Sequence, residues 1–226
     1  LLVEYGSAYN LNIEMFNKLQ HTITGWPGGK PNADDTNRPE RSHPAKKRVI
    51  IFSPHPDDDV ISMGGTFDRL VEQGHEVHVA YQTSGNIAVS DKEAMKFAEV
   101  GLDVNPGANH FQKIIHDLKV KKEFDMDTID VRNLKGLIRR KESLAATRYL
   151  GLPDKNVHFL DLPFYETGRI KKNKLGAEDM RIMDELIKEV KPHQIYAAGD
   201  LADPHGTHKV CLDALFMSLE NLKSFN

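Results

Sequence analysis

A short acidic stretch near the first quarter of the chain carries the residue types best suited to chemistry. Residues 55–59 read His-Pro-Asp-Asp-Asp and directly follow Ser53-Pro54 and the apolar run Val49–Phe52. Three carboxylates packed this closely repel one another, and burying them is costly unless a cation is present. The stretch therefore suggests a divalent metal site, although a solvated acidic loop beside a histidine would have the same composition.

Two histidines near the end of the chain strengthen the case for a metal. His205 and His208 are three residues apart at the start of an expected helix, so both side chains can face one side. Two histidines, one carboxylate and a water form a known catalytic zinc set, in which zinc lowers the pKa of the water towards ~7. A carboxylate that is not a ligand can then deprotonate that water. Spacing alone does not divide the three aspartates between these roles.

Short apolar runs alternate with helical patterns around the two clusters. We expect strands at 49–52, 77–82, 157–160 and 194–198, and helices at 63–73, 91–100, 128–150, 177–190 and 207–222. This alternation predicts an α/β fold, a Rossmann-like three-layer sandwich with a mostly parallel sheet covered on both faces. Ligands bind at the carboxyl ends of strands in such sheets, and both clusters follow strands. His75 and His193 precede strands and are expected at the opposite edge, as surface or loop histidines.

Composition excludes several classes of function. The net charge is −3 and the isoelectric point is near 6.4, so no overall basic field exists to hold nucleic acid. No apolar run approaches the ~20 residues that span a bilayer. The single cysteine, Cys211, excludes an internal disulfide framework and a Cys-rich zinc module, and it favours a reducing, cytoplasmic setting. Any metal must therefore be held by His, Asp or Glu.

The first 46 residues differ in character from the rest. Residues 1–24 show roughly helical apolar spacing, and residues 25–47 are rich in Pro, Gly and polar side chains. We therefore predict an N-terminal helix and linker over residues 1–46 and a compact domain over 47–226. A first residue other than Met suggests a piece of a longer polypeptide. The oligomeric state stays open, with a homo-oligomer as one option.

Four motifs of this sequence occur together in one enzyme family. They are Pro54–Asp58 after a strand, Gly64-Gly65-Thr66 at the next helix, Arg139-x-x-Glu142, and His205-x-x-His208. Together they resemble the LmbE-like (PIG-L) family of zinc-dependent N-deacetylases, which remove acetyl groups from N-acetylglucosamine units of conjugates. The resemblance runs from about Lys47 to the C-terminus. With the Trp26-Pro27-Gly28-Gly29 stretch and residues 197–208 included, the sequence resembles more closely the C-terminal half of bacterial proteins that have an N-terminal glucosamine-6-phosphate deaminase-like domain.

The resemblance implies a role for each residue of the two clusters. His55, Asp58 and His208 would be ligands of Zn²⁺, with Fe²⁺ as the alternative metal. Asp57 would be the base that activates water at the metal. His205 would stabilise the tetrahedral oxyanion or protonate the leaving amine. The implied reaction is hydrolysis of the acetamide of an N-acetylglucosamine-type sugar or sugar phosphate, which releases acetate and the free amine.

The resemblance also implies substrate-binding residues. Arg139 is expected to bind substrate, with Arg140 an equal candidate by position, and Asp161 is expected to contact sugar hydroxyls. Asp59 stands where many family members have Glu. Its only expected role is a contact that supports the metal ligands without binding the metal.

The late motif departs from the family pattern, and two alternative functions are also considered. Residues 206–207 read Gly-Thr where the family commonly has Pro-Asp, so a carboxylate is missing there. A non-catalytic sugar-binding or regulatory domain of a deaminase-like protein would keep the same fold. A different metallohydrolase, such as a phosphoesterase, is a further alternative, although two-metal phosphoesterases usually use more ligands.

Overall fold

The strands form a single parallel sheet in the computed structural model, which describes residues 6–12, 14–15, 46–167, 172–198, 202 and 206–223. The strand order is β3-β2-β1-β4, and each neighbouring pair is parallel. The strands are β1 (Arg48–Ser53), β2 (Glu76–Tyr81), β3 (Val157–Phe159) and β4 (Gln194–Ala197). The helices are α3 (Asp58–Glu72), η2 (Asn86–Ala88), α4 (Asp91–Val104), α5 (Asn109–Val120), α6 (Ile129–Tyr149), η3 (Asp154–Asn156), α7 (Ala177–Val190) and α8 (Thr207–Lys223). The predicted α/β fold with a parallel sheet is confirmed.

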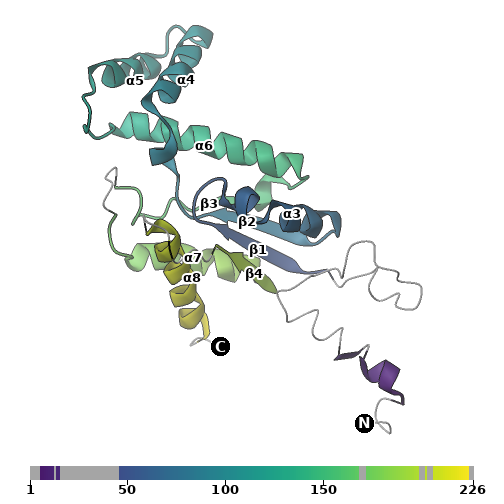
Figure 1. The fold of residues 1–226 in the computed structure, drawn as a ribbon. Coiled ribbons are helices and arrows are strands. Elements are labelled where there is room, and N and C mark those ends of the chain that lie inside the picture. Colours follow the sequence, from purple (N-terminus) through teal and green to yellow (C-terminus); the bar gives the residue numbers. More distant parts are fainter. Residues whose placement is uncertain are drawn as a thin grey trace.

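Helices cover both faces of the sheet (Figure 1). Alternate residues of a strand point to opposite faces, so Ile50 and Phe52 pack in one core with α7 and α8. Val49 and Ile51 pack in a second core, against α3. Because β1 and β2 are buried on both faces, they read as continuous apolar runs rather than alternating ones. The three-layer arrangement expected from the sequence therefore has the sheet as its middle layer.

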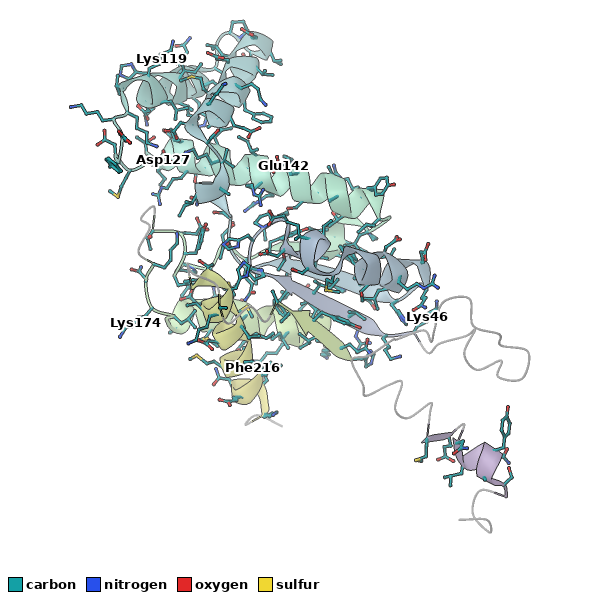
Figure 2. The ribbon with its side chains drawn as sticks, viewed as in Figure 1. Lys46, Lys119, Asp127, Glu142, Lys174 and Phe216 are labelled. Atoms are coloured by element: carbon teal, nitrogen blue, oxygen red, sulfur yellow. The ribbon has the colours of Figure 1, made fainter. Side chains whose placement is uncertain are left out.

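A separate helical unit of α4, α5 and α6 extends from one side of the sheet (Figure 1). Its core comprises apolar residues of all three helices, including Ala98, Ile114 and Leu134. Asp127, labelled in Figure 2, lies just before α6. Its Oδ2 forms an ion pair with Nζ of the buried Lys135 at 2.7 Å. Lys135 also pairs with Asp91 at 2.6 Å. These ion pairs tie the start of α4 to α6.

Two helices differ from the sequence-based expectation. α3 begins at Asp58 rather than Met63, with Met63 as an interruption inside it, because the aspartates of residues 58–59 form its first turn. Carboxylates are favourable at a helix N-terminus. The expectation also missed α5, although Phe111, Ile114 and Leu118 follow a helical spacing. The phenyl ring of Phe111 lies where a Cβ at Gly101 would be, so α4 continues past that glycine.

The expectation for His75 is wrong in part. His75 lies at the amino edge of the sheet as predicted, but it is buried with 7% of its surface exposed. Its Nδ1 accepts the backbone N–H of Lys47 at 3.1 Å, whereas His193 is exposed. Of the N-terminal helix, residues 8–12 and 14–15 are helical, and nearly all of the predicted linker falls outside the described residues. Within the described residues, no helix is long and apolar enough to span a membrane.

Candidate metal centre

The carboxyl edge of the sheet brings together two segments that are far apart in the sequence. β1 and β4 are parallel neighbours, with Val49 opposite Gln194 and Phe52 opposite Ala197. The chain leaves β1 directly into the acidic stretch, and α8 begins ten residues after β4 ends. His55 and His208 are therefore brought into contact across 153 sequence positions.

His55, Asp58 and His208 form a compact cluster. Three of their atoms, His55 Nδ1, Asp58 Oδ2 and His208 Nε2, lie 3.2 Å from one another. Two imidazole nitrogens at that distance need a shared proton or a cation between them. A tetrahedral zinc ion with bonds of about 2.0–2.1 Å holds its ligand atoms about 3.3 Å apart. The donor set and its spacing therefore fit a divalent ion, and this group is the one such cluster in the described part of the chain.

The protonation state of Asp58 suits a metal ligand. Burial opposes its ionisation, but hydrogen bonds from the His55 side chain and backbone N–H hold its pKa below the ordinary value. The backbone contact is 2.8 Å long. The nearby His208 ring acts in the same direction. Asp58 is thus an anion over the whole neutral range, as a ligand of a divalent metal must be.

Asp57 has a different environment from Asp58, although it is the next residue. Its carboxylate forms an ion pair with Arg139 Nη2 at 2.8 Å, and the same guanidinium nitrogen donates a hydrogen bond to the Pro56 carbonyl. Its backbone has φ 146° and ψ −25°, a region that costs a non-glycine residue on the order of 1–3 kcal/mol. Such strain persists only where the surroundings enforce it. The ion pair with Arg139 therefore fixes the direction of this carboxylate, which follows His55 by two residues and directly precedes Asp58.

Two residues that were not predicted as site residues, Tyr165 and Lys172, also lie at the centre. The ring of Tyr165 meets the ring of His55 edge-on, with centroids 5.7 Å apart, and the ammonium of Lys172 lies 3.6 Å above Tyr165. Burial raises the pKa of Tyr165, with the nearby Glu166 carboxylate acting in the same direction, so the phenol stays neutral. The available signal was position alone, because Tyr165 falls in the loop that follows β3 at the carboxyl edge.

The other predicted site residues are Arg139, Asp161 and His205, and none of the three belongs to the described cluster. Asp161 forms an ion pair with Arg140, and the Arg140 guanidinium lies over the Phe159 ring at 4.6 Å. Arg139, by contrast, contacts Asp57. The predicted catalytic residue His205 lies outside the described residues.

A parallel sheet with a His-Asp-His cluster at its carboxyl edge defines an α/β protein equipped to hold a divalent metal. The PIG-L family model, described as GlcNAc-PI de-N-acetylase, matches residues 50–217 of this chain. The chain therefore belongs to the PIG-L family, as its motifs predicted.

Comparison with individual proteins points in the same direction. A putative glucosamine-6-phosphate deaminase-like protein of Bacteroides thetaiotaomicron is 59% identical over 229 residues, which cover 97% of this chain and 34% of that protein. A diacetylchitobiose deacetylase of Thermococcus kodakarensis is 38% identical over 47 residues, or 21% of this chain and 18% of that protein. The chain thus spans about a third of the length of its Bacteroides relative.

A solved structure shares the fold. The N,N'-diacetylchitobiose deacetylase from Pyrococcus horikoshii superposes with a TM-score of 0.52 at 20% sequence identity. The match covers 92% of this chain and 58% of that chain. At this level of identity, the likeness concerns the fold.

Proposed function

We propose that this chain is a zinc-dependent amidohydrolase that removes the acetyl group from an N-acetylglucosamine-type sugar or sugar phosphate. The observation that carries the proposal is the cluster of His55, Asp58 and His208, whose ligand atoms lie 3.2 Å apart beside the constrained carboxylate of Asp57. Membership of a de-N-acetylase family and the similarity to the Thermococcus deacetylase support the same reaction class. The products would be acetate and a free amine.

The residues of the chain divide the work of amide hydrolysis between them. A zinc ion held by His55, Asp58 and His208 would act as a Lewis acid towards water and the amide carbonyl. Asp57 would take the proton from the attacking water, because it is a carboxylate beside the ligands that is not itself one of them. Arg139 holds that carboxylate in place at 2.8 Å. His205 would supply a proton to the leaving amine, a role that rests on the family motif.

The binding of the sugar is proposed on a narrower basis. Tyr165 forms a wall beside His55 and presents an aromatic ring, a surface against which the apolar face of a sugar can pack. Asp161 follows β3 at the same edge of the sheet and forms an ion pair with Arg140. Both side chains carry groups that can hydrogen-bond to sugar hydroxyls. Arg139 would contact substrate only through the part of its guanidinium that Asp57 does not use.

The wider context of the domain is also a proposal. The Bacteroides relative is called glucosamine-6-phosphate deaminase-like and is about three times as long as the matched region. This supports a longer polypeptide in which residues 47–226 form the deacetylase domain, residues 1–46 form a helix and linker, and a deaminase-like domain precedes them. We propose a cytoplasmic setting on the basis of cysteine content. The upstream coding sequence would test the domain order directly.

The reaction is tested by metal content and acetate release. We expect the purified chain to bind close to one equivalent of zinc and to release acetate from N-acetylglucosamine or its 6-phosphate. Iron-loaded protein, prepared without oxygen, should be assayed in parallel to identify the more active metal. Stoichiometric metal with no acetate from a panel of N-acetylated amino sugars would contradict the deacetylase proposal and favour a sugar-binding domain.

Two substitutions separate the ligand role from the base role. His208→Ala removes one of three ligands, so we expect metal content to fall well below one equivalent. Asp57→Ala should keep the metal but lower turnover by about 10²–10⁴-fold, the usual contribution of a general base. Metal analysis and acetate assays on both variants check this. An Asp57→Ala variant with unchanged turnover would show that the base is another residue.

A further inference from the structure

Asp59 is the third acid of the stretch and has neither the ligand role nor the base role. Only 2% of its surface is exposed, and its carboxylate is not among the grouped ligand atoms of His55, Asp58 and His208. A carboxyl group buried this deeply is unfavourable unless other groups hydrogen-bond to it. Its position next to a ligand raises the question of which groups satisfy it.

Two side chains at the ends of neighbouring strands hydrogen-bond to Asp59, one to its carboxylate and one to its backbone N–H. Its Oδ2 accepts the hydroxyl of Tyr81 at 2.8 Å, and its backbone N–H donates to Ser53 Oγ at 3.0 Å. Its Oδ1 lies 3.4 Å from the same Oγ. Ser53 is the last residue of β1 and Tyr81 the last residue of β2, and the two are direct partners in the sheet register. Asp59 therefore links both strand ends to the first turn of α3.

The same serine connects this network to a metal ligand. Ser53 Oγ donates to the backbone carbonyl of His55 at 2.6 Å. The backbone N–H of His55 in turn donates to Asp58 Oδ2 at 2.8 Å. A displacement of Ser53 or Asp59 would therefore move the backbone that carries both ligands.

Tyr81 gives the network a rigid base. It has 1% of its surface exposed, and its ring stacks on that of Phe159 with centroids 5.1 Å apart and an interplanar angle of 18°. Tyr81 and Phe159 are also partners in the sheet register. The phenol therefore cannot rotate away without disturbing β3.

We propose that Ser53, Asp59 and Tyr81 are positioning residues that hold His55 and Asp58 at the spacing a metal requires. The inference rests on the proposed metal-dependent function. Hydrogen bonds that orient metal ligands from outside typically contribute about 10–100-fold to metal affinity. The role assigns a function to the acid that the motif left unexplained.

The test measures the metal site itself rather than catalysis. The 226-residue chain is loaded with Co²⁺, whose visible absorption reports ligand geometry, and affinity is measured by competition with a chelator. We expect Tyr81→Phe to weaken Co²⁺ and Zn²⁺ binding by about 10–100-fold and to change the cobalt spectrum. Asp59→Asn can still accept from Tyr81, so it should retain more affinity than Asp59→Leu.

A matched control separates positioning from general stability. Ser218 is fully buried and donates to Asp184, between α8 and α7 and away from the centre. Ser218→Ala removes a comparable serine–aspartate hydrogen bond. It should lower the melting temperature of the metal-free protein while leaving cobalt affinity and spectrum unchanged.

The outcomes distinguish this inference from the proposed function. Wild-type protein that binds no divalent metal would overturn the proposed function and this inference with it. Wild-type protein that binds metal, with Tyr81→Phe equal to it in affinity and spectrum, would overturn the inference alone. If Tyr81→Phe does not fold, Ser53→Ala, which removes a single oxygen, decides the question by the same two measurements.

Discussion

At the level of single residues, the two adjacent arginines of α6 have different partners. Arg139 donates to the Asp57 carboxylate and the Pro56 carbonyl, and thus braces the acidic stretch from the side. Arg140, one position on, points to Asp161 after β3. Successive helical residues project about 100° apart, so neighbours in sequence serve different loops. Of the two, Arg139 is the one that contacts Asp57, the proposed base.

Lysine substitutions should separate the two arginines. Arg139→Lys keeps the charge but replaces the planar guanidinium with an ammonium on a shorter, more flexible stem, so Asp57 would be less firmly held. We expect turnover to fall by about 10–100-fold, because small displacements of reacting groups are costly. Arg140→Lys alters the proposed sugar-binding pair with Asp161, so it should raise KM while changing turnover less than about threefold. Acetate release by both variants, at equal metal content, checks the difference. A larger loss for Arg140→Lys would reverse the assignment.

At the level of elements, the centre depends on two loops that approach each other closely. The turn after β2 passes through Gly85, which has φ 63° and precedes η2. A Cβ there would lie 2.9 Å from Cδ of Pro56, in the loop after β1. Pro56 separates a ligand residue from the proposed base. Only glycine lets these two loops pack at this distance with that backbone conformation.

A pair of glycine substitutions tests this packing. Gly85→Ala should lower the free energy of unfolding by about 1–3 kcal/mol, since it adds both left-handed strain and a steric clash. It should also weaken metal binding by displacing Pro56. Gly65→Ala is the control: Gly65 lies in α3, and a Cβ there meets nothing within 4 Å. That change should raise stability by about 0.5–1 kcal/mol. Denaturant unfolding measures both, and a neutral Gly85→Ala would show that the loops are not tightly coupled.

At the level of the whole molecule, the two edges of the sheet have different tasks. The carboxyl edge holds the candidate centre, whereas the amino edge holds His75 as a structural residue. Burial lowers the pKa of His75 from 6.5 to about 4, and the charges of Lys47 and Lys46 act in the same direction. Its Nδ1 must stay unprotonated to accept the Lys47 N–H. Protonation at this edge therefore opposes folding.

The pH dependence of stability follows from that shift. Below pH 6.5 the unfolded chain binds a proton at His75 that the folded chain does not bind until about pH 4. The contribution of neutral His75 to the free energy of unfolding is fully present above pH 6.5. It is lost as the pH falls towards 4, by up to about 3 kcal/mol. His75→Gln, which cannot titrate here, should therefore show a smaller loss of stability over this range.

Denaturant unfolding between pH 4 and 7.5 checks this prediction. A chelator should be present, so that protonation of the metal ligands does not contribute through metal release. His116→Gln is the control, because His116 is exposed on α5. We expect it to follow the wild-type pH profile. Equal profiles for His75→Gln and wild type would contradict the role of His75.

Much of the architecture could be predicted because it depends on local patterns. The apolar runs of β1 and β2 and the bounds of α7 follow from composition and period, since buried strands and amphipathic helices need those patterns. The start of α3 was predicted too late, because the glycines at 64–65 suggested an entry point there. The helix expected at 91–100 continues past Gly101 to Val104, and the ring of Phe111 packs where a Cβ of residue 101 would lie.

Sequence patterns and motifs were enough to predict the parallel α/β fold, the family, and the proximity of residues 55–59 to the start of α8 at one edge of the sheet. These follow from strand order along the chain and from motif chemistry. The family resemblance implied different roles for Asp57 and Asp58, and the tertiary structure shows that all three aspartates have different surroundings. Asp58 converges with two histidines, Asp57 pairs with Arg139, and Asp59 is buried against a tyrosine. The physical reason is that consecutive side chains at a helix start point in different directions, and their neighbours come from distant parts of the chain.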